Sequence, residues 1–158
     1  MAGRLFEYTK EEPTPEMPKR STKGSAGYDF YAVEETVVPS FWHNLWLIIR
    51  GKTPQPTIIK TNIKAKMEDY EVLMLFNRSS NPSKGLILAN GVGVVDSDYY
   101  NNSSNEGNIG FAFFNLSPRK TVIKAGEKIG QGVFMTYLRT NDDSTGATRK
   151  GGFGSTGS

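Results

Sequence analysis

The sequence predicts a single all-β domain, a distorted jelly roll that forms a β-sandwich or barrel. Its apolar stretches are short, several of them alternate apolar and polar residues, and 17 glycines and 8 prolines interrupt the 158 residues. These features are typical of half-buried strands joined by turns, and a chain of this length buries one core. We expect the domain to span residues 1–140, and residues 141–158 to form a flexible, glycine-rich C-terminal arm.

The amino-acid composition limits which metal sites and catalytic groups the chain can have. The chain has no cysteine, which excludes disulfides and zinc-thiolate sites, and its one histidine, His43, lies among bulky apolar residues, so a carboxylate is the better candidate for a general base. A metal would then take oxygen ligands, as Mg²⁺ does. The net charge of +3 is too small and too interleaved for a nucleic-acid partner. Leu45–Ile49 is too short an apolar run to cross a membrane, and no signal peptide is visible, so we expect a cytoplasmic protein.

The first half of the chain predicts strands separated by proline-rich loops. Arg4–Tyr8 reads as a short strand, and Tyr28–Tyr31 reads as an aromatic strand in which Asp29 lies on the face opposite its aromatic neighbours. Phe41–Ile49 is so rich in bulky apolar residues that we expect a strand plus a buried corner, at a subunit contact or, as an alternative, a partner-binding patch. Thr57–Met67 alternates as one strand.

A buried strand is expected next, at Tyr70–Phe76, because nearly every residue in it is apolar. It leads directly into Asn77–Pro82, where Ser and Asn before a proline are typical of the start of a short helix. Free N–H groups beside Arg78, Ser79 and Ser80 are the components of a phosphate site, although an ordinary capped turn has the same composition.

The stretch Leu86–Tyr100 predicts a hairpin with a functional exit. Asn90 and Gly91 tolerate positive φ and stand between apolar β-formers, which is a strong hairpin signal. Exposed backbone groups in such a turn can read a flat, uncharged ring by hydrogen bonds, and Asp96 at its mouth can act on the bound molecule. The alternative is a plain turn with a solvated exit.

The remaining elements are strands and the arm. Gly107–Asn115, Thr121–Ile123 and Ile129–Tyr137 read as strands. In the arm, Phe153 lies between glycines and near two cations, where it could stack on a base while backbone amides hold an anion. The twelve steps from Asn141 to Phe153 span roughly 40 Å if extended, which reaches a neighbouring subunit. A disordered tail is the alternative.

Five separated blocks, in order from Ala26 to Gly157, resemble the trimeric all-β dUTPases, and the chain looks closest to forms from Gram-positive bacteria and their phages. The blocks begin with Ala26-Gly27-Tyr28-Asp29-Phe30 and Arg78-Ser79-Ser80, continue through the predicted hairpin and the strand at 107–115 with Gln131, and end with the arm. Five ordered motifs are more specific than any single one.

The resemblance implies a homotrimer whose sites each take residues from three chains and hydrolyse dUTP to dUMP and pyrophosphate with Mg²⁺. It implies that Asp96 activates the attacking water, that Asp29 holds Mg²⁺ through water, and that Tyr99 packs under the deoxyribose and excludes a 2′-hydroxyl. The positions matching substrate-binding residues are Arg78, Ser79, Ser80, Asn90, Val94, Val95, Tyr99, Gln131, Arg149, Phe153, Gly154, Ser155 and Thr156.

The chain departs from the family pattern in three places. Tyr100–Glu106 is longer than usual, Arg149 lies one residue closer to Phe153 than in the commonest spacing, and Pro39–Pro56 is longer and more aromatic. Two alternative functions remain at this point. One is dCTP deaminase, which shares the fold but needs a carboxylate beside the exocyclic amine, and the other is a non-catalytic, nucleotide-responsive binding or regulatory protein.

Overall fold

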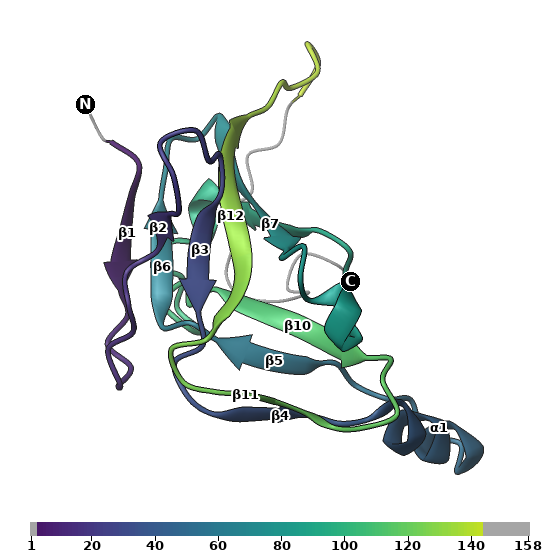
Figure 1. Ribbon diagram of the computed structural model, residues 1–158. Helices are drawn as coiled ribbons and strands as arrows, with labels where there is room; N and C mark the ends of the chain where they lie inside the picture. The colour runs from purple at the N-terminus through teal and green to yellow at the C-terminus, as the bar shows by residue number, and fades with distance from the viewer. Residues whose placement is uncertain (1–2, 144–158) are drawn as a thin grey trace.

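The computed structural model describes residues 3–143 and shows an antiparallel β fold in four sheets (Figure 1). The largest sheet has the strand order β2-β3-β12-β7-β9, a second has the order β5-β10-β8, and β1-β6 and β11-β4 form two-stranded pairs. The strands are β1 Leu5–Tyr8, β2 Lys19–Arg20, β3 Tyr28–Tyr31, β4 Thr36–Val38, β5 Thr57–Lys60, β6 Ile63–Lys66, β7 Glu71–Asn77, β8 Leu86–Leu88, β9 Gly93–Asp96, β10 Gly110–Asn115, β11 Thr121–Ile123 and β12 Lys128–Thr136. The helices are α1 Phe41–Ile49 and two 3-10 turns, η1 Pro82–Lys84 and η2 Ser97–Tyr99.

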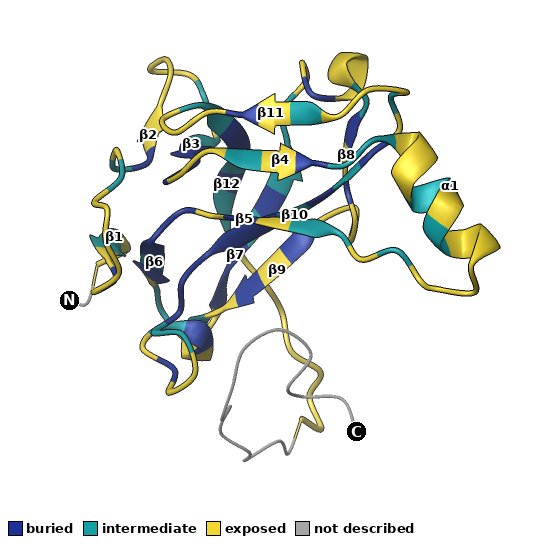
Figure 2. Cartoon of the chain, turned by 90° about the horizontal axis from the view of Figure 1, so that it is seen from below, coloured by how far each residue is buried: buried dark blue, intermediate teal, exposed yellow. Residues whose placement is uncertain are grey.

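The hydrophobic core lies between the sheets, and aromatic rings fill its centre. Phe30, Phe111 and Phe113 are almost completely buried, and Ile59 and Leu73 pack in the same cluster (Figure 2). These residues come from four strands that are far apart in the sequence, so the core joins the sheets into one body. The predicted all-β fold, with a short helix after Arg78-Ser79-Ser80, is confirmed.

The predicted hairpin at 86–100 is wrong in its pairing. The chain does reverse at Asn90-Gly91, where Gly91 adopts a φ of 68°, but β8 pairs with β10 and β9 pairs with β7. The turn therefore carries the chain from one sheet to another. Asn-Gly chemistry favours the reversal of direction, but it does not select the strand that each arm pairs with.

The predicted strand at Phe41–Ile49 is also wrong, because this segment is the helix α1. Ser40 caps the helix by accepting a hydrogen bond at Oγ from the His43 backbone N–H, at 3.4 Å. Trp42, Trp46 and Ile49 form a stripe with helical spacing that points away from the body, and Ile49 is 76% exposed. Figure 2 shows α1 at the periphery, mostly exposed.

The predicted strand Thr57–Met67 is two strands, because the backbone breaks at Asn62, whose φ is 51°. The inward face is nevertheless as expected, since Ile59, Thr61 and Ala65 are all buried. Across residues 3–143, no helix combines the length and the apolar composition that crossing a membrane requires.

Candidate functional site

Asp29 lies in β3 and is tied to two other elements. Its Oδ2 accepts a hydrogen bond from Ser21 Oγ at 2.7 Å and forms an ion pair with Lys128 Nζ at 2.7 Å. Burial raises the pKa of the Asp29 carboxyl, but the hydrogen bonds from Lys128 and Ser21 and the charges of Lys128 and Arg78 more than offset this, so its pKa lies below the ordinary value. Asp29 is therefore an ionised carboxylate with a fixed orientation at neutral pH.

Arg78 follows β7 directly and lies over the start of β12. Its guanidinium donates to the Lys128 carbonyl at 3.2 Å, and its backbone N–H donates to Asn77 Oδ1 at 2.9 Å. The buried Asn81 side chain donates to Asn77 Oδ1 and to the Ile129 carbonyl, at 2.7 and 2.8 Å. These contacts fix the turn that presents Ser79 and Ser80, and both serines are exposed.

Gln131 completes this group from β12. It lies opposite Asp29 in the ladder, and its Nε2 donates to the Asn77 carbonyl at 3.4 Å. Gly27 makes room for it, because a Cβ at that position would lie 2.4 Å from Gln131 Oε1. The structure thus brings Asp29, Arg78 and Gln131 into one neighbourhood, which we name the phosphate end after the role that the family resemblance implies for it.

A second group of predicted residues lies along β9. Val95 is buried in the core, whereas Asn90 is exposed and Val94 is 59% exposed. Asp96 is exposed at the last position of β9, and the 3-10 turn η2 follows it. Tyr99 ends that turn, and its ring is only 6% exposed.

We name Asp96 and Tyr99 the sugar end, and strand register separates it from the phosphate end. Gln131 lies opposite Phe76 of β7, whereas Asp96 lies opposite Val72. Four residues of strand separate these positions on β7, which is about 13 Å. Within one chain, the two groups therefore lie at different ends of β7.

The two groups nevertheless share a face of the five-stranded sheet. Directly opposed residues in a ladder point to the same side, and so do residues four apart in a strand. Asp29, Gln131 and Asp96 consequently project from the face that is turned away from the core. Apolar residues accompany them on this outer face, including the half-exposed Met135 and the exposed Val94.

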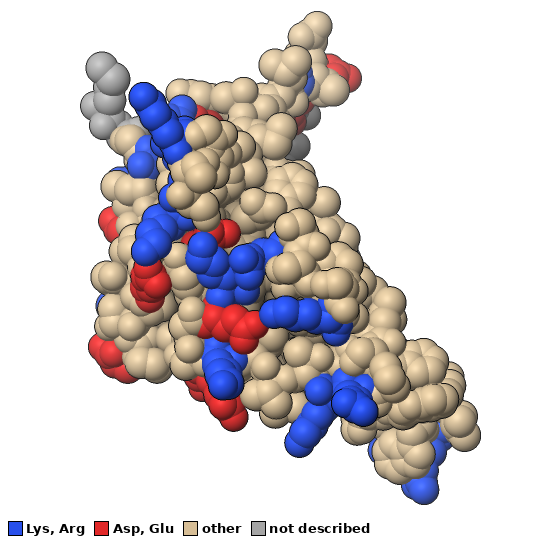
Figure 3. All heavy atoms as spheres, in the orientation of Figure 1, with Lys and Arg blue, Asp and Glu red and all other residues tan. Residues whose placement is uncertain are grey.

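The electrostatic character of the phosphate end suits a small anion. Figure 3 shows Lys and Arg side chains over the β3–β12 part of the sheet, with carboxylates beside them. Within residues 3–143, no cluster of three or more His, Asp or Glu residues could hold a metal ion by itself. Asp29 still fits Mg²⁺, which is often held by one or two carboxylates together with waters and substrate phosphates.

Several residues at the site were not predicted from the sequence. Lys128 and Ser21 fix Asp29, Asn77 and Asn81 fix the Arg78 turn, and three asparagines described below fix Tyr99. The asparagine-rich segment 101–108 was a visible compositional signal, whereas the Lys128–Asp29 pair depends on strand register, which the local sequence does not encode. The predicted residues Arg149, Phe153, Gly154, Ser155 and Thr156 lie outside the described residues.

Comparison with known proteins shows the family to which the chain belongs. The sequence profile of the dUTPase family matches residues 14–157. A deoxyuridine 5′-triphosphate nucleotidohydrolase from Lactococcus lactis is 44% identical over 144 residues, which cover 89% of this chain and 87% of the relative. One from Desulfitobacterium hafniense is 35% identical over 95% of this chain and 93% of its own length.

Solved structures show the same fold. The crystal structure of a dUTPase from Streptococcus mutans superposes with a TM-score of 0.72 at 40% identity, covering 86% of this chain and 98% of that one. A mutant dUTPase from phage phi11 of S. aureus, in which a structural Mg(II) ion is coordinated, gives a TM-score of 0.68 over 92% of this chain and 97% of that one. Because its identity is 20%, this second likeness concerns the fold alone.

Proposed function

The chain belongs to the dUTPase family and is a dUTP diphosphatase, and we propose that Asp96 activates the water that cleaves dUTP to dUMP and pyrophosphate at a site shared between chains. This reaction would keep uracil out of DNA and supply dUMP for the synthesis of dTMP. The observation that supports the proposal is the division of the predicted residues between two ends of β7 on one outer face of the sheet.

A site shared between chains follows from that division. One copy of the phosphate end and one copy of the sugar end, from neighbouring chains, would meet around a single nucleotide in a homotrimer. The partly apolar outer face supports this assembly, because exposed apolar surface on a sheet is typical of subunit contacts. The arm of a third chain would close the site, with Phe153 stacked on uracil and Arg149, Gly154, Ser155 and Thr156 at the phosphates.

The chemistry requires one base and several positioning groups. Asp96 takes a proton from water as the water oxygen bonds to the α-phosphorus, and the bond from the α-phosphorus to the bridging oxygen breaks to release pyrophosphate. Arg78, Ser79 and Ser80 bind phosphate oxygens. Gln131 orients the water and an α-phosphate oxygen.

Asp29 would hold Mg²⁺ through water. The bound metal would neutralise charge on the three phosphates and on the leaving pyrophosphate. The ionised state of Asp29, which Lys128 and Ser21 maintain, suits this task because a protonated carboxyl binds hard cations poorly.

The uracil and the deoxyribose of dUTP would be recognised by hydrogen bonds and by shape, respectively. The turn at Asn90 and the backbone at Val94 and Val95 would pair with uracil O4 and N3–H, and cytosine reverses that donor–acceptor pattern. The buried ring of Tyr99 would leave no room for a 2′-hydroxyl.

Substrate comparison tests the proposal. Purified protein with Mg²⁺ is given dUTP, dCTP, dTTP or UTP, and both pyrophosphate and ammonia are measured. We expect pyrophosphate from dUTP, far less from the other three, and no ammonia. Ammonia from dCTP would instead identify a deaminase, and tight dUTP binding without turnover would identify a binding protein.

A further inference from the structure

Hydrogen bonds hold the Tyr99 side chain and backbone. Its hydroxyl donates to the Asn108 carbonyl at 3.0 Å and accepts from Asn105 Nδ2 at 2.7 Å. Its backbone carbonyl accepts from Asn102 Nδ2 at 2.9 Å. Because the ring is also buried, its position is fixed by polar contacts as well as by packing.

Two of the three asparagines that hold Tyr99, Asn102 and Asn105, are themselves fixed. Asn102 Nδ2 donates to Asn105 Oδ1 at 2.8 Å, and Asn102 Oδ1 accepts from the Ser104 backbone N–H and hydroxyl at 3.0 and 2.7 Å. Gly107 donates its backbone N–H to Asn105 Oδ1 at 3.1 Å, and a Cβ on Gly107 would lie 2.6 Å from the Tyr99 carbonyl. We name Asn101–Asn108 the asparagine loop.

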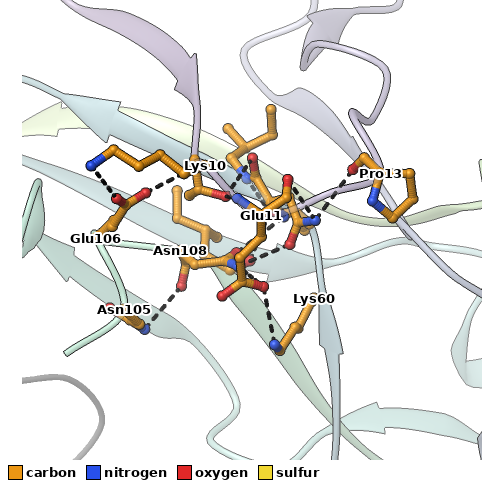
Figure 4. Close-up of polar contacts among 12 residues, drawn as sticks. Lys10, Glu11, Pro13, Lys60, Asn105, Glu106 and Asn108 are labelled. Atoms are coloured by element: carbon orange, nitrogen blue, oxygen red, sulfur yellow. Dashed lines mark hydrogen bonds and ion pairs between the residues drawn. The ribbon is translucent and has the colours of Figure 1, made fainter.

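The N-terminal segment holds the asparagine loop in turn. The Lys10 backbone N–H donates to Glu106 Oε2 at 2.9 Å, and Lys10 Nζ lies 3.4 Å from Glu106 Oε1. Asn108 Nδ2 donates to Glu11 Oε2 at 3.4 Å and to Asn62 Oδ1 at 3.0 Å. Figure 4 shows Lys10 beside Glu106 and Glu11 beside Asn108.

The asparagine loop contains no apolar side chain that could replace these bonds. A surface hollow of about 440 Å³ lies against it, lined by Lys10, Lys64, Asn101, Asn102, Ser103 and Glu106. Loss of one hydrogen bond should therefore loosen the ring of Tyr99 without unfolding the sheets, since the ring lies in the apolar core and the other residues of that core keep their contacts.

We propose that Asn102 and Asn105 are positioning residues that set how strictly this chain rejects a ribose. The inference rests on the proposed role of Tyr99 under the deoxyribose. The Tyr99 ring can exclude a 2′-hydroxyl sterically only while it cannot move aside. Asn105 holds its hydroxyl and Asn102 holds its backbone carbonyl. A ring held in this way should reject UTP more strictly than a ring held by packing alone. The sugar specificity of this chain thus depends on its lengthened asparagine loop.

The experiment measures kcat and KM for dUTP and for UTP in five proteins. Four of them are wild type, Asn105→Ala, Tyr99→Phe and the double variant. The fifth is Asn44→Ala on α1, a control for loss of an asparagine on a different element. We expect Asn105→Ala to lower the dUTP-to-UTP ratio of kcat/KM about three- to tenfold, which is the contribution of one hydrogen bond. The kcat for dUTP should stay within about twofold, since Asp96 is unaffected.

The double variant distinguishes positioning from mere stability. If Asn105 acts through the Tyr99 hydroxyl, then Tyr99→Phe alone also lowers the ratio, and adding Asn105→Ala changes it by less than about twofold. The inference would be overturned if the two substitutions lowered the dUTP-to-UTP ratio of kcat/KM independently, so that their effects multiplied in the double variant. It would also be overturned if Asn105→Ala lowered the unfolding temperature but left that ratio unchanged. A wild-type protein that hydrolyses dUTP and UTP equally well would instead overturn the proposed role of Tyr99.

Discussion

The two ends of β7 are organised by different forces. At the phosphate end, charged groups from three elements converge, with Lys128 paired to Asp29 and Arg78 bound to the Lys128 carbonyl. At the sugar end, neutral asparagines fix Tyr99. Charges are suited to holding phosphates and metal, and neutral hydrogen bonds are suited to fixing a shape. Neither end has both the proposed base and the proposed phosphate-binding groups, which supports the proposal that catalysis takes place between chains.

The largest expected effect comes from the sugar end. Asp96→Asn should lower kcat for dUTP about a hundredfold to ten-thousandfold, because it removes the general base but keeps the shape. Affinity for a non-hydrolysable dUTP analogue should persist. Asp69→Asn, in which the altered side chain is 79% exposed, is the matched control and should leave kcat unchanged. An Asp96→Asn protein that keeps a tenth of the activity would refute the base assignment.

Mixing the two ends tests whether they come from different chains. Asp96→Asn and Arg78→Ala subunits, each nearly inactive as pure proteins, are unfolded together and refolded at equal ratio. In the mixture, half of the phosphate ends and half of the sugar ends are wild type. About a quarter of the sites that form between chains should therefore combine two wild-type ends, and turnover should recover to about a quarter of the wild-type value. Mixtures as inactive as their parents would show that both ends serve a site within one chain.

Removal of the C-terminal arm should lower activity less than the Asp96→Asn substitution does. Truncation after Lys150 removes the proposed stacking of Phe153, which is worth a factor of about 5 to 150 in kcat/KM on the scale of base–aromatic contacts. The unfolding temperature should not change, since residues 3–143 already form an apolar cluster that joins the sheets. Full-length Phe153→Ala should reproduce most of the loss, and a fully active truncated protein would exclude the arm from the site.

A finer change tests the geometry of the phosphate end. In Gly27→Ala, the new Cβ would lie 2.4 Å from Gln131 Oε1, so the Gln131 side chain must turn away. We expect kcat to fall about three- to tenfold through misplacement of this group. Gly24→Ala in the same loop meets no atom within 4 Å and should be neutral. Equal kinetics in the two variants would show that the Gln131 orientation is unimportant.

The smallest effect concerns stability and pH at the phosphate end. The folded-state pKa of Asp29 lies below the ordinary value of about 3.9, so its contribution to the free energy of unfolding is present above that pH and is lost as pH falls through the folded-state pKa. Urea unfolding of wild type and Asp29→Asn should therefore show a difference that is constant from pH 7 to pH 5 and smaller near pH 3. A difference that grows in acid would contradict the Asp29–Lys128 pairing.

The sequence predicted those features that depend on local pattern. Alternation placed Ile59 and Ala65 inside, and the apolar run at 70–76 predicted the interior strand β7. Pairing was not predictable from local pattern, because Asn90-Gly91 specifies a reversal whether its arms join one sheet or two. The helix α1 was missed because a dense apolar run is typical of a buried strand, and its helical stripe faces outward.

The same limit applies to the site. The sequence identified Asp29, Arg78 and Gln131 as candidates, and the structure groups them. It did not identify Lys128 as the partner of Asp29, because that contact requires β3 and β12 to be adjacent in register. Residues that fix other residues are identified by distance in space, which a one-dimensional pattern does not contain.

The helix α1 has a practical consequence for solution spectroscopy. Both tryptophans of the chain, Trp42 and Trp46, lie on it, far from Asp96 in sequence and on a different element. Trp42 is 60% exposed, and the Arg50 guanidinium lies 4.6 Å from the centroid of the Trp46 ring. Tryptophan fluorescence therefore reports the surroundings of this one helix, and quenchers added to the solvent will sense α1.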